Sequence, residues 1–278
     1  MIGFFDSGLG GLTILREVIK SIPGQFLYLG DNARAPYGSR SQEEVQAFTT
    51  QGVKWLIDQG CSLVVLACNT ASANALRTIQ QDWLPQHAPR ARVLGILVPT
   101  IEVITGMDWQ HEETSNHVES ILVFATPSTV ASGAYEREIK KRLPNALVVS
   151  QACPDLASMI EEGSEPTLIE QKIQQYIQEG KEKMGSKPEA VLLGCTHYAL
   201  VESVFRKNLD VQTRIFSQPQ IVTRSLLEYL SRHPLEGAGA PSSVTCFTTA
   251  DPDQVATVSK RFSDLPIRYT QVDIDKNG

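Results

Sequence analysis

Two cysteines of this 278-residue chain stand in matching surroundings. Cys68 directly follows the apolar run 63–67 (LVVLA), and Cys195 follows the run 190–194 (AVLLG). Each run has the length and composition of a buried strand, and a helix-like stretch follows each cysteine. Because the N-terminus of a helix presents free N–H groups and a partial positive charge, we expect both sulfurs to favour the thiolate form.

A symmetric pair of weak acids could invert the configuration of one carbon atom. One thiolate would remove a proton from one face of the carbon, the opposing thiol would return a proton to the other face, and the roles would reverse for the other enantiomer. A hydrolase needs one nucleophile with a histidine base, and redox chemistry needs thiols that can meet. The sequence therefore predicts a racemase that works with Cys68 and Cys195 and without a cofactor.

Polar residues stand beside both sulfurs. Asn69 and Thr70 follow the first cysteine, and Thr196 and His197 follow the second. A lone Cys-x-His could suggest zinc, but no second pair of ligands is visible, so we predict no metal site. No lysine context favours a Schiff base, although the sequence leaves open a bound pyridoxal cofactor.

Composition excludes some classes of partner. With a net charge of −6, the chain has no broad basic surface to hold nucleic acid or an anionic membrane, and no apolar run approaches the ~20 residues that span a bilayer. No signal peptide is recognisable before the first apolar run. The five cysteines are odd in number and irregularly spaced, so we expect reduced thiols and a cytoplasmic protein.

The chain repeats itself, which supplies the elements that must position the two cysteines. Three segments of the first half recur in the same order in the second, with a single insertion: 16–23 as 137–144, 54–60 as 174–180, and 63–70 as 190–197. Amphipathic α/β units resemble one another in any case, but the ordered set favours two similar lobes. Short apolar runs alternate with amphipathic stretches throughout, which predicts an α/β fold with mostly parallel, buried strands. Ligands of such sheets bind beyond the carboxyl ends of the strands, so the two cysteines should approach one ligand from opposite sides.

A glycine-rich turn, residues 6–11 (DSGLGG), follows the first apolar run. Its amides could hold an anion, or the turn could be purely structural. Asp6 could pair with a substrate ammonium or assist Cys68. A polar loop, residues 30–38 (GDNARAPYG), follows the second run.

Four motifs in order make the match to a known family specific. They are 6–11 (DSGLGG), 30–38 (GDNARAPYG), 67–71 (ACNTA) and 194–198 (GCTHY). With these motifs the chain resembles the bacterial glutamate racemases, within the aspartate/glutamate racemase superfamily, from Gly3 to about Phe216. It departs from the family at Ala199, where proline is usual, and at 155–158 (DLAS), which is more polar than usual.

The resemblance implies a role for each matching residue. Cys68 and Cys195 would be the proton donors and acceptors, with Asp6 and His197 assisting the thiols. The residues that would bind the substrate are Asp6, Ser7, Tyr37, Gly38, Asn69, Thr70, Thr196 and His197, together with Glu161 near the site.

The resemblance also implies an architecture and a role in the cell. Two pseudo-symmetric three-layer α/β lobes would hold the active site in the cleft between them, the first made of residues 1–96 plus 209–278 and the second of residues 97–208. The product, D-glutamate, would supply peptidoglycan synthesis. Family members are often dimers, so a homodimer is one possibility.

Three alternatives remain open at this level. The same chemistry could act on another acidic amino acid such as aspartate, because pocket depth is not legible from the sequence. A decarboxylase or isomerase of the superfamily would need only one cysteine. A non-catalytic ligand-binding protein on this scaffold would need neither thiol.

Overall fold

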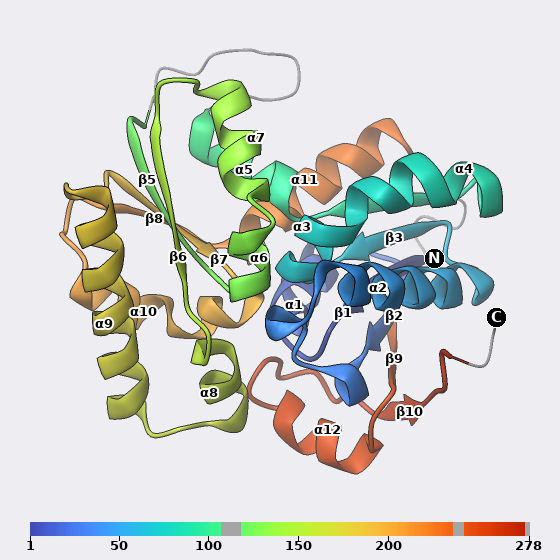
Figure 1. The fold of residues 1–278 in the computed structure, drawn as a ribbon. Coiled ribbons are helices and arrows are strands. Elements are labelled where there is room, and N and C mark those ends of the chain that lie inside the picture. Colours follow the sequence, from blue (N-terminus) through green and yellow to red (C-terminus); the bar gives the residue numbers. More distant parts are fainter. Residues whose placement is uncertain (107–117, 236–241, 276–278) are drawn as a thin grey trace.

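Two parallel β-sheets lie side by side and form the framework of the molecule (Figure 1). The computed structural model describes residues 1–106, 118–235 and 242–275. Within these ranges six strands form one sheet and four form the other. We call each sheet with its covering helices a lobe.

The first sheet has the strand order β10-β9-β2-β1-β3-β4. Its strands are β1 (Ile2–Asp6), β2 (Gln25–Gly30), β3 (Leu63–Leu66), β4 (Arg92–Gly95), β9 (Ser243–Thr248) and β10 (Tyr269–Gln271). All five residues of β1 and all four of β3 are buried. This burial explains their unbroken apolar sequence, since a parallel strand between two layers of helices has no face in water.

The second sheet has the order β6-β5-β7-β8. Its strands are β5 (Ser120–Ala125), β6 (Leu147–Ala152), β7 (Ala190–Gly194) and β8 (Arg214–Phe216). Every pairing between neighbouring strands in the two sheets is parallel. The predicted α/β class with parallel sheets is confirmed.

Helices connect and cover the strands. The helices next to the first sheet are α1 (Leu12–Ser21), α2 (Gln42–Asp58), α3 (Asn69–Thr78), α4 (Leu84–His87), α11 (Gln218–Arg232) and α12 (Pro252–Ser259). Those next to the second sheet are α6 (Pro127–Ala131), α7 (Ala134–Arg142), α8 (Leu156–Glu162), α9 (Pro166–Met184) and α10 (Glu202–Asn208). Helix α5 (Leu97–Thr105) lies between the lobes, where it packs against α7 and α11. The described residues also form short 3-10 turns, η1 (Asn32–Arg34), η2 (Tyr37–Ser39) and η4 (Thr196–Val201), and a π-helical turn, η3 (Ile79–Trp83).

The sequence repeat corresponds to equivalent elements of the two lobes. Its three matches fall on α1 and α7, on α2 and α9, and on β3 and β7. The strand order β2-β1-β3-β4 recurs as β6-β5-β7-β8. The lobes are therefore built on one pattern, and Cys68 and Cys195 follow equivalent strands.

The predicted lobe boundary at residue 209 needs correction. Strand β8 pairs with β7 through Ala190↔Arg214 and the following residues, so it belongs to the second sheet, where it is the counterpart of β4. We propose that the second lobe runs from residue 97 to residue 216, and that residues 217–275 return to the first lobe.

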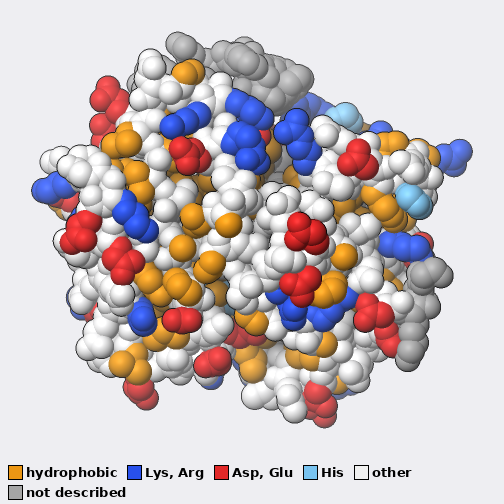
Figure 2. Space-filling view, in the orientation of Figure 1, with side chains coloured by type: hydrophobic (Ala, Val, Ile, Leu, Met, Phe, Trp, Pro, Cys, Tyr) orange, Lys and Arg blue, Asp and Glu red, His pale blue; other side chains and the backbone are white. Residues whose placement is uncertain are grey.

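One hydrophobic core extends across both lobes. It includes Phe4 and Val65 of the first sheet, Ile104 of α5, and Val123 and Leu192 of the second sheet. Two further clusters fill the outer faces of the two sheets. Acidic and basic side chains are interspersed over the face drawn in Figure 2.

Candidate active site

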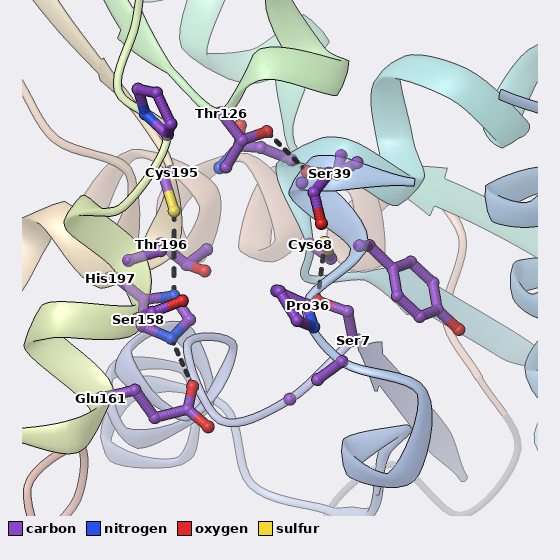
Figure 3. A pocket seen from close by; sticks show the side chains of 18 of the residues that line it. Ser7, Pro36, Ser39, Cys68, Thr126, Ser158, Glu161, Cys195, Thr196 and His197 are labelled. Atoms are coloured by element: carbon purple, nitrogen blue, oxygen red, sulfur yellow. Dashed lines mark hydrogen bonds and ion pairs between the residues drawn. The ribbon is translucent and has the colours of Figure 1, made fainter. Parts of the chain in front are cut away.

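A cavity of about 310 Å³ is lined by residues of both lobes, beyond the carboxyl ends of the central strands (Figure 3). Its volume lies at the small end of the range for ligand sites. The sequence-predicted residues that line it are Ser7, Tyr37, Gly38, Cys68, Asn69 and Thr70 from the first lobe, and Glu161, Cys195, Thr196 and His197 from the second. The fold thus brings ten of the eleven predicted residues to one cavity, with the two sulfurs on different sides of it.

Cys68 occupies the N-cap of α3, where its sulfur accepts a hydrogen bond from the Ala71 N–H at 3.5 Å. The Ser7 hydroxyl lies 3.4 Å from the same sulfur. Burial, reinforced by the nearby charge of Asp6, raises the pKa of Cys68 to about 12, and the contacts with Ser7 and Ala71 only moderate this rise. The expectation that the helix N-terminus would favour the thiolate is therefore wrong for Cys68, because desolvation outweighs the helix.

Cys195 directly follows β7 and occupies the N-cap of the 3-10 turn η4. Its sulfur lies 3.8 Å from Nδ1 of His197, and Nε2 of the same ring lies 2.7 Å from a carboxylate oxygen of Glu161. Burial disfavours the imidazolium, but the hydrogen bonds to Cys195 and Glu161 outweigh it and raise the pKa of His197 to about 10. At neutral pH a positive imidazolium therefore stands beside Cys195.

Asp6 lies at the end of β1 but does not line the cavity. Its carboxylate accepts hydrogen bonds from the N–H groups of Gly8 at 2.6 Å and Gly11 at 3.0 Å. The anion that the glycine-rich turn holds is thus the side chain of its own first residue. Burial raises the pKa of Asp6 to about 6, although the positive charge of His197 opposes the rise.

Gly10 allows the turn to approach the second lobe closely. A Cβ atom at this position would lie 2.2 Å from the Thr196 hydroxyl oxygen and 2.6 Å from Nδ1 of His197. Both distances are far below contact, so no larger residue fits while Thr196 and His197 keep their places. The glycine-rich turn of the first lobe therefore packs closely against the residues that follow Cys195 in the second lobe.

Tyr37 is buried, and its hydroxyl donates a hydrogen bond to the carboxylate of Asp31. Asp31 also accepts from Nε of Arg34 at 2.7 Å and from the Thr249 hydroxyl at 2.8 Å. Tyr37 lines the cavity as predicted, but its hydroxyl is already hydrogen-bonded to Asp31.

Asn69 is held by two residues from distant parts of the chain. Its Nδ2 donates to the side-chain oxygen of Gln218 at 2.6 Å, and its own oxygen accepts from Gln218 at 2.8 Å and from the Tyr135 hydroxyl at 2.5 Å. Asn69, held in this way, lines the cavity. Gln218 and Tyr135 carried no signal in the sequence, because they lie 149 and 66 residues from their partner.

Comparison with known proteins agrees with this geometry. The model of the family described as "Asp/Glu/Hydantoin racemase" matches residues 12–223 of the chain. The chain belongs to this racemase family.

Relatives of this family member match it over nearly its full length. The glutamate racemase of Caulobacter sp. (strain K31) is 42% identical over 278 residues, covering 96% of this chain and 98% of the relative. That of Roseobacter denitrificans is 43% identical over 273 residues, covering 97% and 98%. The predicted resemblance to the glutamate racemases is confirmed, and the protein is an amino-acid racemase, an isomerase.

Solved structures of glutamate racemases share the fold of this racemase. Isoform RacE1 from Bacillus anthracis superposes with a TM-score of 0.86 at 30% identity, covering 98% of this chain and 97% of that one. The enzyme from Francisella tularensis, solved in complex with D-glutamate, gives a TM-score of 0.85 at 29% identity, with coverage of 99% and 97%.

Thr126 is a lining residue of this racemase that we did not predict. Its hydroxyl lies 3.0 Å from those of Thr70 and Thr129, and these two are 3.2 Å apart, so the three hydroxyls form a triangle between the lobes. The repeat held a signal for it, because Thr126 follows β5 at the place where the glycine-rich turn follows β1.

Further lining residues missed in the sequence include Ser39 and Ser158, which add hydroxyls, and Pro154 and Glu162. Within the described ranges, no three His, Cys, Asp or Glu side chains gather as a metal site would require. In the same ranges no helix has the length and apolar character needed to traverse a bilayer.

Proposed function

We propose that this protein racemises glutamate by moving protons between the substrate Cα and the thiols of Cys68 and Cys195. The observation that carries the proposal is that two buried cysteines, each following an equivalent strand of its lobe, line one small cavity from different sides. The names of the relatives and the D-glutamate complex of the Francisella tularensis enzyme support glutamate as the substrate.

The surroundings of the two sulfurs suggest which one starts as the base. The His197 imidazolium stabilises negative charge on Cys195, whereas burial keeps Cys68 a neutral thiol. In the resting protein Cys195 is therefore set to accept a proton from Cα, and Cys68 is set to donate one to the opposite face. After one turnover Cys195 carries the proton and Cys68 has lost its own, which is the state required for the reverse reaction; a second turnover in the same direction requires the two sulfurs to exchange protons with water.

The cavity wall suits an amino acid that carries two carboxylates. Besides the imidazole of His197, its donors are hydroxyls and amides, including Ser7, Ser39, Asn69, Thr70 and Thr196, and in the part of the chain that the structure describes no lysine or arginine lines it. Neutral donors aimed at the α-carboxylate would stabilise the charge that develops there when Cα loses its proton. The carboxylates of Glu161 and Glu162 at the wall favour the substrate ammonium.

The proposal requires no cofactor, because the cysteines supply both the base and the acid. A role in supplying D-glutamate for peptidoglycan and a cytoplasmic location are parts of the same proposal. A homodimer stays a prediction, which sedimentation analysis of the purified protein would test.

Incubation of the purified, cofactor-free protein with L-glutamate in D2O tests the proposal. We expect deuterium at Cα in both enantiomers and loss of optical rotation, with much slower reactions on aspartate and glutamine. Faster reaction on aspartate would replace the proposed substrate, and folded protein that neither exchanges nor racemises any of the three would refute the function.

A further inference from the structure

The C-terminal part of the first lobe reaches the second lobe beside the residues that contact Cys195. Phe262, three residues after the end of α12, is fully buried, and its ring packs against the imidazole of His197. The ring centroids are 5.2 Å apart and the planes are inclined by 83°, an edge-to-face contact. One flank of the His197 ring is thus covered by a residue that does not line the cavity.

Phe262 is held in place by its own lobe. Its carbonyl oxygen accepts a hydrogen bond from Nη1 of Arg16 on α1 at 3.1 Å, and its N–H donates to the carbonyl of Ser259 at 2.9 Å. The position of the His197 ring therefore depends on a backbone segment that is fixed to the first lobe.

Arg261 makes a second contact across the lobes, to the residue that binds the other side of the His197 ring. Its Nη1 donates to the carbonyl oxygen of Glu161 at 2.5 Å, near the end of α8. Gly163 follows with φ +73°, and a Cβ there would lie 2.3 to 2.5 Å from the guanidinium of Arg261. Glycine thus both ends the helix in the left-handed conformation and leaves room for the arginine.

We propose that Phe262 and Arg261 are positioning residues: they hold the His197–Glu161 pair against Cys195 and so set the reactivity of Cys195 without affecting Cys68. The inference rests on the two-cysteine chemistry proposed above. Among the described residues, the titratable groups that face His197 are Asp6 at the end of β1, Glu161 on α8 and Cys195 itself. Loss of the ring of Phe262 would let water reach the imidazole and weaken its hydrogen bond to Cys195.

Alkylation of the two cysteines in the same sample tests this inference. The rate of reaction with iodoacetamide is measured for each cysteine by peptide mass spectrometry over a range of pH, without glutamate. In Phe262→Leu we expect alkylation of Cys195 at neutral pH to slow about three- to tenfold relative to Cys68, because the thiolate is the nucleophile. The limiting rate of alkylation of Cys195 at high pH should stay within about twofold, which shows that access of the reagent to the sulfur is unchanged.

Matched variants control for general loosening of the protein. Phe26 is as buried as Phe262 and also packs edge-to-face, against Phe4 at 6.1 Å, so Phe26→Leu should leave the ratio of the two alkylation rates unchanged. Arg261→Gln should shift the ratio in the same direction as Phe262→Leu, but less, whereas Arg268→Gln, at an exposed arginine of the same segment, should not. If Phe262→Leu does not fold, the ratio of the two alkylation rates in Arg261→Gln tests the positioning role.

The racemase assay adds an independent readout. Because neither residue lines the cavity, we expect kcat to fall in Phe262→Leu while KM for glutamate stays within about twofold. Equal changes at both cysteines, or none at Cys195, would overturn the positioning role even if glutamate is racemised. If the unmodified protein does not racemise glutamate but Phe262→Leu still slows the alkylation of Cys195 alone, the proposed function is refuted and the positioning role stands.

Discussion

The sulfur of Cys195 lies 3.8 Å from Nδ1 of His197, whereas the sulfur of Cys68 has the hydroxyl of Ser7 at 3.4 Å. The two lobes share one pattern of strands, but they surround their cysteines differently. The imidazole can carry a full charge and titrate, and a serine hydroxyl cannot near neutral pH. Proton transfer at Cys195 and proton transfer at Cys68 should therefore respond differently to pH and to mutation.

We predict that kcat/KM falls above about pH 10. The pKa of His197 is raised to about 10, so the imidazolium is present at neutral pH and is lost as the pH rises through that value. We also expect kcat/KM to fall below about pH 6, where the buried carboxyl of Asp6 takes up a proton. Measurement of kcat/KM from pH 5 to 11 checks this acid limb and the alkaline limb near pH 10. His197→Asn should lose the alkaline limb near pH 10, and an unchanged profile in that variant would contradict the assignment.

Replacement of either of the two thiols that we propose as proton donors and acceptors should nearly abolish racemisation. We expect Cys68→Ser and Cys195→Ser each to lower kcat roughly 10²- to 10⁴-fold, the usual contribution of a general acid or base. Cys246→Ser is the matched control, because Cys246 is a buried, reduced cysteine on β9 that does not line the cavity. Full activity in either of the first two variants would exclude a mechanism that uses both thiols.

Gly10→Ala should lower kcat/KM at least about 100-fold, since displacement of a catalytic group by an ångström has effects of this size. The added methyl group would collide with the Thr196 hydroxyl and the His197 ring. Gly8→Ala is the comparison within the same turn, because its Cβ would meet its neighbours at 3.5 to 3.9 Å, which is ordinary contact. Equal losses in the two variants would show that the turn is merely intolerant of alanine.

Thr126→Val should raise KM for glutamate about tenfold with little change in kcat, which corresponds to the loss of about one hydrogen bond. Valine keeps the shape of threonine but removes the hydroxyl from the triangle with Thr70 and Thr129. Thr223→Val is the control, because the hydroxyl of Thr223 donates to the Pro219 carbonyl within α11. An unchanged KM would mean that the triangle serves only to join the lobes.

Tyr37→Phe should affect stability more than substrate binding. It removes a hydrogen bond to the buried carboxylate of Asp31 and should lower the free energy of unfolding by about 1.5–3 kcal/mol. KM for glutamate should change less than about twofold, because the hydroxyl is committed to Asp31. Urea denaturation and steady-state kinetics distinguish this result from the reverse pattern, which would indicate a hydroxyl that binds substrate.

The sequence identified the two cysteines because a repeat of strands and helices is visible in local patterns. Apolar runs predicted β3 and β7, and the matching position of a cysteine after each predicted that both face one ligand. The same logic could have identified Thr126, because it directly follows β5, and the glycine-rich turn begins where the equivalent strand β1 ends.

Features that depend on distant partners were beyond sequence reasoning. The raised pKa of Cys68 arises from burial by both lobes, which no local pattern records. The hydroxyl of Tyr37 and the amide of Asn69 are directed by Asp31 and Gln218, whose side chains show no periodic signal. The short strand β8 was assigned to the wrong lobe because three residues are too few to display alternation or an apolar run.

The hydrophobic core that joins Phe4, Ile104 and Val123 crosses from one sheet to the other. To swing the sheets apart as independent bodies would expose this shared interior, at a cost of about 25 cal/mol for each Å² of apolar surface. Entry and exit of a small ligand should therefore proceed through modest displacements at the rim. For the same reason the chain, although built from two similar halves, should melt in a single cooperative transition in calorimetry.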